Sequence, residues 1–365
     1  MGMSEAQVKI QWLDFEPGRR ILVISDIHGN LEYLNGVLAL AAYSPEDELI
    51  IDGDFLEKGP ACLATLRRIM SLSRQGRVHP VRGNCDGWHT IFDNDERKNR
   101  HLLEYLRWKG NGFLWELFSS LGVDIREIDR LEPYIPFLHR YDEEFDFIRS
   151  LPDGIDSENF TFVHAGRSPD KPLQAHSRDE LNRIDRFMDR GDSFDKWTVV
   201  GHYPVVLYGE DKVCANPIIE RRRKIISIDG GCILKDDGQL NALIIPHKDS
   251  EDFSFAAYDR FPERRVLEDQ AGGSRSYYIR WGDSQVQVLE RGEEFSRCRH
   301  VRTGYEMDIL TKYLFTDKEV TGCNDCTDYV LPLKAGDIVR VVETTSRGYF
   351  VKHDGVSGWY FGELE

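Results

Sequence analysis

The chain has 365 residues and a formal net charge of −16 at pH 7. This length exceeds that of a typical single domain, so we expect one large domain with one or two smaller ones. The acidic balance argues against a protein that neutralises a nucleic-acid backbone, because such a surface needs clustered Lys and Arg. No apolar run is long enough to span a bilayer, and the N-terminal MGMSEAQVKIQW lacks the basic-then-apolar order of a signal peptide. Together with an odd number of cysteines, seven, these features predict a cytoplasmic protein with reduced thiols.

The first third of the chain alternates between strand and helix patterns. The apolar, β-branched run ILVIS (21–25) predicts a strand, and NLEYLNGVLALAAY (30–43) carries apolar residues at helical spacing. The runs DELIIDGD (47–54) and RVHPVRGN (77–84) repeat the strand signal on either side of the helical GPACLATLRRIMSLSRQG (59–76). This order predicts a βαβαβ unit with parallel strands, which binds ligands at the carboxyl ends of its strands.

Polar side chains follow these strands and also the later apolar runs FTFVHAG and WTVVGHYP. The pattern predicts that six metal-competent side chains reach one edge of a sheet, namely Asp26, His28, Asp54, Asn84, His164 and His202. Carboxylate, imidazole and amide ligands together suit manganese, iron or zinc. Each residue alone has an ordinary interpretation as a turn residue or a hydrogen-bonded histidine. Their ordered series favours two divalent ions about 3.5 Å apart that clamp a phosphoryl group.

At these residues the chain resembles the calcineurin-like metallophosphoesterases, and within them the phosphoprotein phosphatase branch, over roughly residues 20 to 246. The family motifs read here as Asp26-Ile27-His28, Gly53-Asp54-Phe55-Leu56-Glu57-Lys58-Gly59, Gly83-Asn84-Cys85-Asp86, His164 and His202. The resemblance implies an α/β fold in which helices flank a β-sandwich, and a metal-bridging hydroxide as the nucleophile. It also implies that Asp26, His28 and Asp54 hold one metal. Asp54, as the bridge, would hold the other with Asn84, His164 and His202.

Three positions depart from the family pattern. Lys58 replaces an arginine that grips phosphate, so phosphate binding should persist with a looser orientation. Glu57 replaces the aspartate that orients the catalytic histidine, and Cys85 replaces that histidine itself, a poorer proton donor near neutral pH. The resemblance therefore gives Cys85, Glu57 and Asp86 as candidate catalytic residues. It gives Lys58, Asn84 and the loosely aligned Arg186 as candidate phosphate-binding residues.

The later motifs VHAGRSPD, VVGHYPV and ISIDGGC resemble those of bacterial and phage members, which include protein phosphatases and symmetrical diadenosine tetraphosphate hydrolases. We therefore expect a serine/threonine-phosphatase-like phosphomonoesterase that acts on a phosphorylated protein or a nucleotide-type substrate. Cysteine at position 85 also resembles compact phosphodiesterases of the superfamily. A phosphodiesterase or dinucleoside polyphosphate hydrolase is thus the alternative, and a scaffold that kept the fold without catalysis is a second one.

Residues 1–262 are expected to form the catalytic domain, interrupted by a helical cap over residues 88–152. The cap would lie over the strand ends and select the substrate. Its polar residues His89, His101 and Arg107 are weak candidates for substrate binding.

The end of the chain changes character. Short runs such as YYIRW and VQVLE predict a β-rich connecting segment over residues 263–326. Residues 327–365 resemble a Src homology 3-like barrel, which would dock a peptide or protein through Tyr349, Trp359 and Tyr360 or would only pack on the catalytic domain. A zinc site is a weaker prediction, and its ligands would be Cys298, His300, Cys323 and Cys326.

Overall fold

A computed structural model describes residues 8–87 and 96–365. The chain divides into two compact units. The first contains the described residues up to 204 together with 217–234 and 238–259, and the second contains 205–216, 235–237 and 260–365. The second unit is thus formed by the C-terminal residues and two internal segments.

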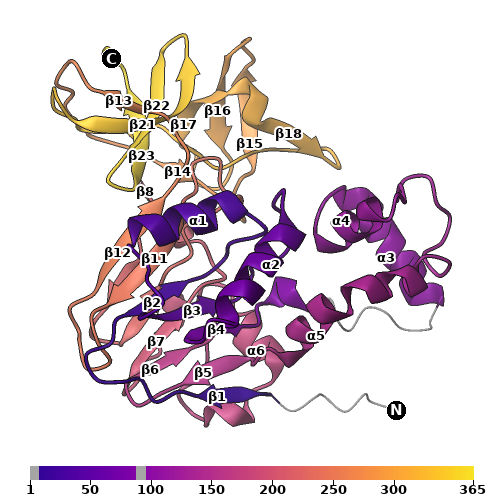
Figure 1. Cartoon of the computed structure of the whole chain (residues 1–365). Helices are drawn as coiled ribbons and strands as arrows, with labels where there is room; N and C mark the ends of the chain where they lie inside the picture. Colours follow the sequence, from indigo (N-terminus) through magenta and orange to yellow (C-terminus); the bar gives the residue numbers. More distant parts are fainter. Residues whose placement is uncertain (1–7, 88–95) are drawn as a thin grey trace. The chain divides into compact units, whose positions relative to one another are not determined.

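The first unit begins with the predicted βαβαβ order (Figure 1). Its elements are β2 (Ile21–Ile24), α1 (Leu31–Leu40), β3 (Glu48–Asp52), α2 (Cys62–Ser73) and β4 (Val78–Val81). The three strands are parallel, with Ile21 opposite Glu48 and Leu49 opposite Val78. On the other side of β2, β11 (Leu240–Ile245) and β12 (Ser254–Tyr258) add antiparallel strands and complete a five-stranded sheet.

A second sheet of six strands packs against the first. Its order is β1 (Ile10–Trp12), β5 (Gly154–Asp156), β6 (Phe160–Phe162), β7 (Trp197–Val200), β10 (Ile225–Ser227) and β9 (Ile218–Glu220). Val23 of β2 shares a buried cluster with Phe162 and Val199 of this second sheet. The alternate residues Leu22 and Ile24 belong to the cluster that includes the apolar sides of α1 and α2. Both faces of β2 are thus covered, which explains its continuous apolar sequence and confirms the expected sandwich flanked by helices.

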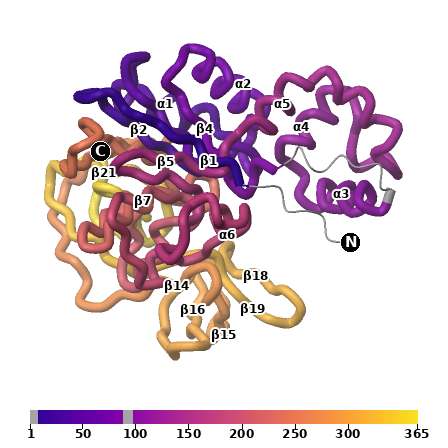
Figure 2. Tube along the Cα trace, turned by 90° about the horizontal axis from the view of Figure 1, so that it is seen from below, coloured from indigo at the N-terminus to yellow at the C-terminus, as the bar shows by residue number. Residues whose placement is uncertain are grey.

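The described part of the 88–152 insertion is helical. It contains α3 (Glu96–Lys109), α4 (Phe113–Ser120), a 3₁₀ turn at Ile135–Tyr141 and α5 (Asp142–Ser150). Both ribbon and tube views place α3 and α4 to one side of the sheets (Figures 1 and 2). Phe113 and Phe145 of the insertion share one buried cluster with Leu66 of α2. The insertion therefore extends the helical layer of the first unit.

Three shorter helical segments complete the part of the first unit that bears on the site. They are the 3₁₀ turn at Asn84–Asp86, α6 (Arg178–Asn182) and the 3₁₀ turn at Phe187–Arg190. α6 starts at a capping box in which Ser177 and Glu180 bond each other's backbone N–H groups. This cap fixes the direction of the short helix.

The strands of the second unit pair in antiparallel ladders, as expected. The first two sheets, in spatial order, are β13 (Glu263–Arg265), β21 (Ile338–Thr345), β22 (Gly348–His353), β23 (Val356–Tyr360) and β8 (Val213–Cys214), and β14 (Tyr278–Ile279) with β20 (Cys326–Thr327). The others are β15 (Val286–Glu290), β16 (Phe295–His300) and β17 (Glu306–Leu310), and β18 (Leu314–Asp317) with β19 (Val320–Cys323). Residues 327–365 supply only the three central strands of the first sheet. The predicted barrel over those residues alone is not confirmed, because β13 and β8 complete the sheet from outside the range.

Contacts in the second unit disagree with the roles predicted for two residues, Tyr360 and His300. Tyr360 is fully buried and its hydroxyl donates to the Glu268 carbonyl at 2.9 Å, so it cannot dock a partner at the surface. The ring nitrogens of His300 lie 2.8 Å from Thr303 Oγ1 and 2.9 Å from the Asp283 carbonyl. His300 therefore does not share a site with the cysteines, although Cys323 and Cys326 sulfurs are 3.8 Å apart.

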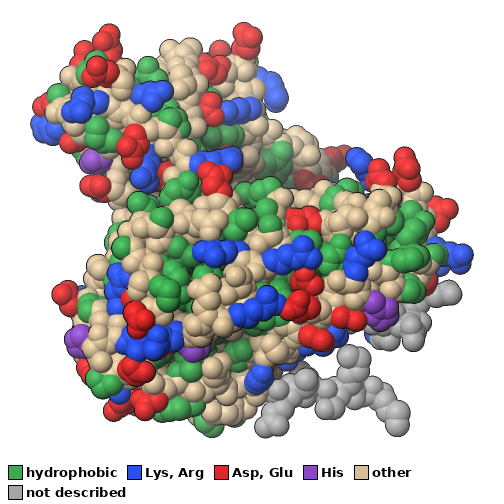
Figure 3. All heavy atoms as spheres, viewed as in Figure 1, with side chains coloured by type: hydrophobic (Ala, Val, Ile, Leu, Met, Phe, Trp, Pro, Cys, Tyr) green, Lys and Arg blue, Asp and Glu red, His purple; other side chains and the backbone are tan. Residues whose placement is uncertain are grey.

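The sequence is rich in charged residues of both signs, and both signs are present on the described surface. On the face shown in Figure 3, acidic and basic side chains are interspersed over both units. Among the described residues, no helix has the length and apolar character needed to cross a membrane.

Candidate metal centre and pocket

The candidate ligands lie in loops that follow strands of both sheets of the sandwich. Asp26, Asp54 and Asn84 follow β2, β3 and β4, whereas His164 and His202 follow β6 and β7 of the other sheet. The expectation of a single sheet edge is thus corrected, since the two sheets present their carboxyl ends to the same site. Seven candidate residues have left-handed backbones, namely Asp26, His28, Asp54, Glu57, Lys58, Arg186 and His202. Such conformations cost about 1–3 kcal/mol each and concentrate at functional sites.

Two glycines allow these loops to approach the carboxylates. A Cβ on Gly83 would lie 2.2 Å from Asp54 Oδ1, and a Cβ on Gly201 would lie 2.3 Å from Asp26 Oδ2. Any side chain at either position would displace a candidate ligand. The Gly-Asn and Gly-His pairs of the motifs are therefore explained by close packing, beyond their tendency to form turns.

One group of ligand atoms contains Asp54, His164 and His202, whose donor atoms lie within 4.8 Å of one another. His164 Nε2 is 3.3 Å from Asp54 Oδ1 and 3.2 Å from Asn84 Oδ1. The other ring nitrogen of His164 lies 2.9 Å from the Asp52 carbonyl, which orients the imidazole. The structure thus brings together the four residues predicted for one metal.

A second group contains His28, Asp54 and Cys85, again within 4.8 Å. His28 Nε2 is 3.8 Å from Asp26 Oδ1 and 4.0 Å from Asp54 Oδ2, so the three residues predicted for the other metal also converge. Asp54 belongs to both groups, as a bridging ligand requires. The thiol of Cys85 was not predicted as a member.

The buried charges of this centre are unevenly compensated. Burial and the neighbouring Asp229 raise the pKa of Asp26 well above its usual range, and Asp26 Oδ1 has no hydrogen-bond partner. Burial and Lys58 lower the pKa of His28 to about 3, so its imidazole is neutral and can act as a ligand. Burial would raise the pKa of Asp54, but His164 holds it well below its usual value. A buried carboxylate oxygen without a partner, beside neutral imidazole, fits a divalent cation.

Asp86 and Glu57 have other contacts than those expected of catalytic residues. Asp86 accepts hydrogen bonds from the backbone N–H groups of Asp54, Leu56 and Gly83, so it ties the β3 and β4 loops together. Burial raises the pKa of Asp86 to about 7. Both carboxylate oxygens of Glu57 are engaged by the insertion, one by Lys109 Nζ at 2.8 Å and the other by the Phe113 N–H at 2.8 Å.

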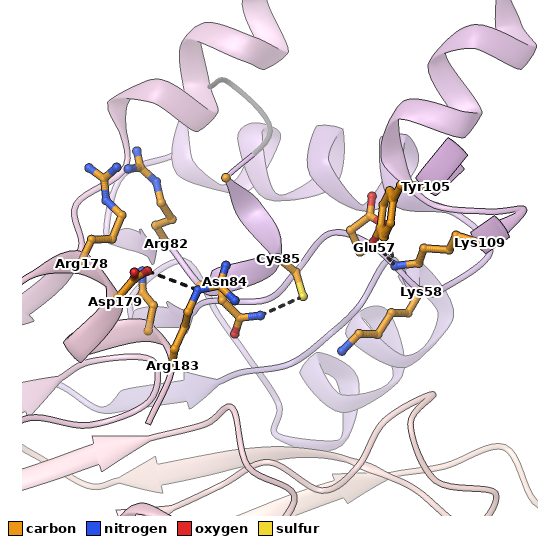
Figure 4. A pocket seen from close by; sticks show the side chains of 13 residues that line it. Glu57, Lys58, Arg82, Asn84, Cys85, Tyr105, Lys109, Arg178, Asp179 and Arg183 are labelled. Atoms are coloured by element: carbon orange, nitrogen blue, oxygen red, sulfur yellow. Dashed lines mark hydrogen bonds and ion pairs between the residues drawn. The ribbon is translucent and has the colours of Figure 1, made fainter. Parts of the chain in front are cut away.

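A pocket of about 510 Å³ opens beside the candidate ligands. It is lined by Glu57, Lys58, Arg82, Gly83, Asn84, Cys85, Gly87, Tyr105, Lys109, Arg178, Asp179, Asn182 and Arg183. Figure 4 shows the α6 residues on one side and Lys58, Lys109 and Tyr105 on the other, with Asn84 and Cys85 between them. Burial would lower the pKa of Lys109, but its hydrogen bond to Glu57 raises it, so Lys109 stays cationic.

Several pocket residues were missed by the sequence analysis. The described lining contains Arg183 rather than the predicted Arg186, which pairs with Asp189 at 2.6 Å three residues further on. From the insertion it contains Tyr105 and Lys109 instead of His101, which is exposed, and Arg107, which binds the Ile125 carbonyl at 3.1 Å. His89 lies outside the described residues. Helical spacing gave a usable signal, because Tyr105 and Lys109 are four residues apart and share one face of α3.

Comparison with known proteins places residues 19–230 in a match to the calcineurin-like phosphoesterase family model. The symmetrical bis(5'-nucleosyl)-tetraphosphatase of Psychromonas ingrahamii is 29% identical over 155 residues, which are 42% of this chain and 46% of the relative. The enzyme of the same name from a Janthinobacterium species is 29% identical over 147 residues, 40% of this chain and 43% of the relative. The chain therefore spans about half the length of the curated relatives it matches. A metallophosphoesterase structure from Sphaerobacter thermophilus aligns with a TM-score of 0.40 and 19% identity, over 66% of this chain and 89% of that one.

Proposed function

We propose a substrate class for this chain, which belongs to the calcineurin-like phosphoesterase family and is a hydrolase of phosphoester bonds. The proposed substrate carries two or more consecutive phosphates on a nucleoside, and the enzyme cleaves a phosphorus–oxygen bond within that group. This reading favours the dinucleoside polyphosphate alternative over the phosphomonoesterase that the sequence first suggested. The relatives named bis(5'-nucleosyl)-tetraphosphatase support it.

The observation that carries the proposal is the excess of cations in the pocket. Five cationic side chains and two carboxylates line it, in a chain whose net charge is −16. Fewer than five cations suffice to bind a single phosphate monoester. A polyphosphate carries about one negative charge on each phosphate, so it can interact with more of them. Arg178 and Arg82 share the buried Asp153, at 2.7 Å and 3.4 Å. Lys109 pairs with Glu57 at 2.8 Å and Arg183 with Asp179 at 3.3 Å, so a polyphosphate would share these two cations with their carboxylates and would meet Lys58 directly.

The chain's own residues would bind and orient the substrate. Lys58 and Arg183 approach the space beside Asn84 from opposite sides of the pocket (Figure 4). Arg183 presents a planar fork that suits the paired oxygens of a phosphate, and Lys58 provides a point charge. Lys109, on the insertion, would reach a phosphate further along the polyphosphate group of the substrate. Tyr105, whose ring centroid is 5.6 Å from Lys109 Nζ, would flank the nucleoside end.

Two divalent ions would be held by the residues of the two ligand groups, with Asp54 common to both. When bound, such ions neutralise phosphate charge and lower the pKa of water, so that a nucleophile forms near neutral pH. His164 and His202 would serve as ligands in this arrangement, and no protein base is required.

A hydrolysis screen with manganese tests the proposal. Its substrates are diadenosine tetraphosphate, a phosphopeptide, an aryl monoester and an aryl diester. We expect diadenosine tetraphosphate to be cleaved with the highest kcat/KM. Faster turnover of the phosphopeptide would return the assignment to the phosphomonoesterase, and a fastest diester would favour the phosphodiesterase.

A matched pair of variants sharpens the screen. Arg183→Ala should lower kcat/KM for the polyphosphate by about 10- to 100-fold, the loss of one charge-assisted hydrogen bond. Arg186→Ala should have little effect, since Arg186 bonds Asp189 outside the pocket. The reverse result would show that the loose sequence alignment identified the right arginine and that the pocket does not bind the phosphates.

A further inference from the structure

Cys85 lies among candidate metal ligands, and its backbone holds it there. Its sulfur, a ring nitrogen of His28 and a carboxylate oxygen of Asp54 are mutually within 4.8 Å. The N–H of Cys85 donates to Asp54 Oδ1 at 2.7 Å, at the 3₁₀ turn that starts at Asn84. This hydrogen bond fixes the backbone of Cys85 beside the carboxylate that both ligand groups share.

We propose that Cys85 is a protein ligand, as a thiolate, of the ion that Asp26, His28 and Asp54 hold. The inference rests on the two-metal centre of the proposed function and adds a donor that neither the family pattern nor the comparisons assign. Its basis is the grouping of the sulfur with His28 and Asp54, together with the unpartnered Asp26 Oδ1 only 3.8 Å from His28 Nε2.

The sulfur has a hydrogen-bond donor and a lysine near it, but burial and the Asp54 carboxylate raise the pKa of the free thiol well above its usual range, so the bound ion itself would hold Cys85 as a thiolate. Asn84 Nδ2 donates to Sγ at 3.4 Å, while Oδ1 of the same amide is turned toward His164. Lys58 is the cation that favours the charged form of Cys85, and its Nζ lies 3.4 Å from His28 Nε2. Glu57, whose carboxylate would repel a thiolate, has both oxygens engaged by Lys109 and Phe113.

A thiolate ligand makes the two ions unequal. The group with His164 and His202 offers only nitrogen and oxygen atoms, which suit manganese, iron or zinc. The group with Cys85 adds sulfur, a soft donor that favours zinc, iron or cobalt over magnesium and manganese. Cys85 would also no longer be available to protonate a leaving group, because a coordinated thiol is deprotonated.

Cobalt(II) provides a readout that does not depend on activity. We expect the metal-stripped full chain, titrated with Co²⁺, to bind two ions and to develop a thiolate-to-cobalt charge-transfer band in the near ultraviolet. Cys85→Ser should abolish the band. It should also weaken zinc binding at one of the two sites by at least about tenfold, since even the loss of an outer hydrogen-bond partner costs 10- to 100-fold.

The pair Cys323 and Cys326, with sulfurs 3.8 Å apart, supplies the matched control. Cys326→Ser should leave the band intact, and a band that survives Cys85→Ser but disappears in Cys326→Ser overturns the inference. Zinc X-ray absorption of the Cys323→Ser/Cys326→Ser chain, which retains Cys85, should show one sulfur at about 2.3 Å. Two bound ions without a sulfur ligand would overturn the inference alone, whereas a chain that binds no metal would overturn the proposed function as well.

Discussion

Replacement of Glu57 should loosen the helical insertion rather than disturb Cys85. The Glu57 side chain is almost completely buried, and its two oxygens accept hydrogen bonds from Lys109 and from the first N–H of α4. Gly112 is needed for this contact, because a Cβ there would lie 2.4 Å from Glu57 Oε2 and its φ is 109°. Glu57→Ala leaves Lys109 and the Phe113 N–H without their acceptors.

The expected cost follows from these two hydrogen bonds. Removing one partner of a buried charge pair typically costs about 3–5 kcal/mol, and an unsatisfied N–H accounts for part of that. Glu57→Gln keeps an acceptor for Phe113 and loses only the charge, so we expect about half the cost. At 1.36 kcal/mol per tenfold, the protection of the Phe113 amide against hydrogen exchange should fall by about 10²- to 10⁴-fold in Glu57→Ala.

Hydrogen exchange followed by mass spectrometry measures this locally, which avoids a two-state assumption for a chain with two units. Glu116→Ala is the control, because Glu116 accepts from the N–H groups of Cys62 and Leu63 at the start of α2. It should expose those amides and leave the Phe113 amide less affected. Unchanged protection of Phe113 in Glu57→Ala would refute the anchoring role.

Three further perturbations test other parts of the first unit. Asp54→Asn should reduce bound metal from two ions and lower turnover, whereas Cys326→Ser should not; elemental analysis that finds two ions in Asp54→Asn would show that Asp54 does not bridge them. Asp153→Asn should lower the free energy of unfolding by about 3–5 kcal/mol in urea titrations, because it leaves Arg82 buried without an anion, while Asp179→Asn at an exposed site should change it by less than about 0.5 kcal/mol. His176 accepts the Ser168 N–H at 2.9 Å and burial lowers its pKa, so its contribution is present above its ordinary pKa near 6.5 and is lost as the pH falls below that value. His176→Gln should flatten this part of the stability profile between pH 7 and 5, and an unchanged slope in thermal unfolding would exclude His176 as its source.

The strands and helices of the first unit could be predicted because the strands are continuous apolar runs and the helices carry apolar residues at helical spacing. Leu22 and Ile24 face helices while Val23 faces the other sheet, and such a strand has an unmistakable apolar run. The ligands could be located for the same reason, since each follows a strand directly. The convergence of the two sheets on one centre could not be predicted, because it depends on how strands far apart in the sequence pack together.

The features that could not be predicted depend on contacts between residues far apart in the sequence. Glu57 and Lys109 are 52 residues apart, and nothing local marks them as partners. Arg183 and Arg186 are both arginines near the end of a short helix, and only the path of the chain decides which one lines the pocket. Likewise nothing local marks Tyr360 as buried, because its hydroxyl bonds the Glu268 carbonyl, 92 residues away in the sequence.

The interleaving of the two units constrains how this protein can be altered or inherited. The chain passes from one unit to the other after residues 204, 216, 234, 237 and 259. A stop codon near residue 262 would therefore leave β8 without β23, its partner through the Val213–Ser357 and Cys214–Val356 pairs. A fusion or truncation at a single point cannot add or delete the second unit cleanly. The two units are expected to be gained, lost and recombined together, and a transplant of the second unit into another protein would need three separate insertions.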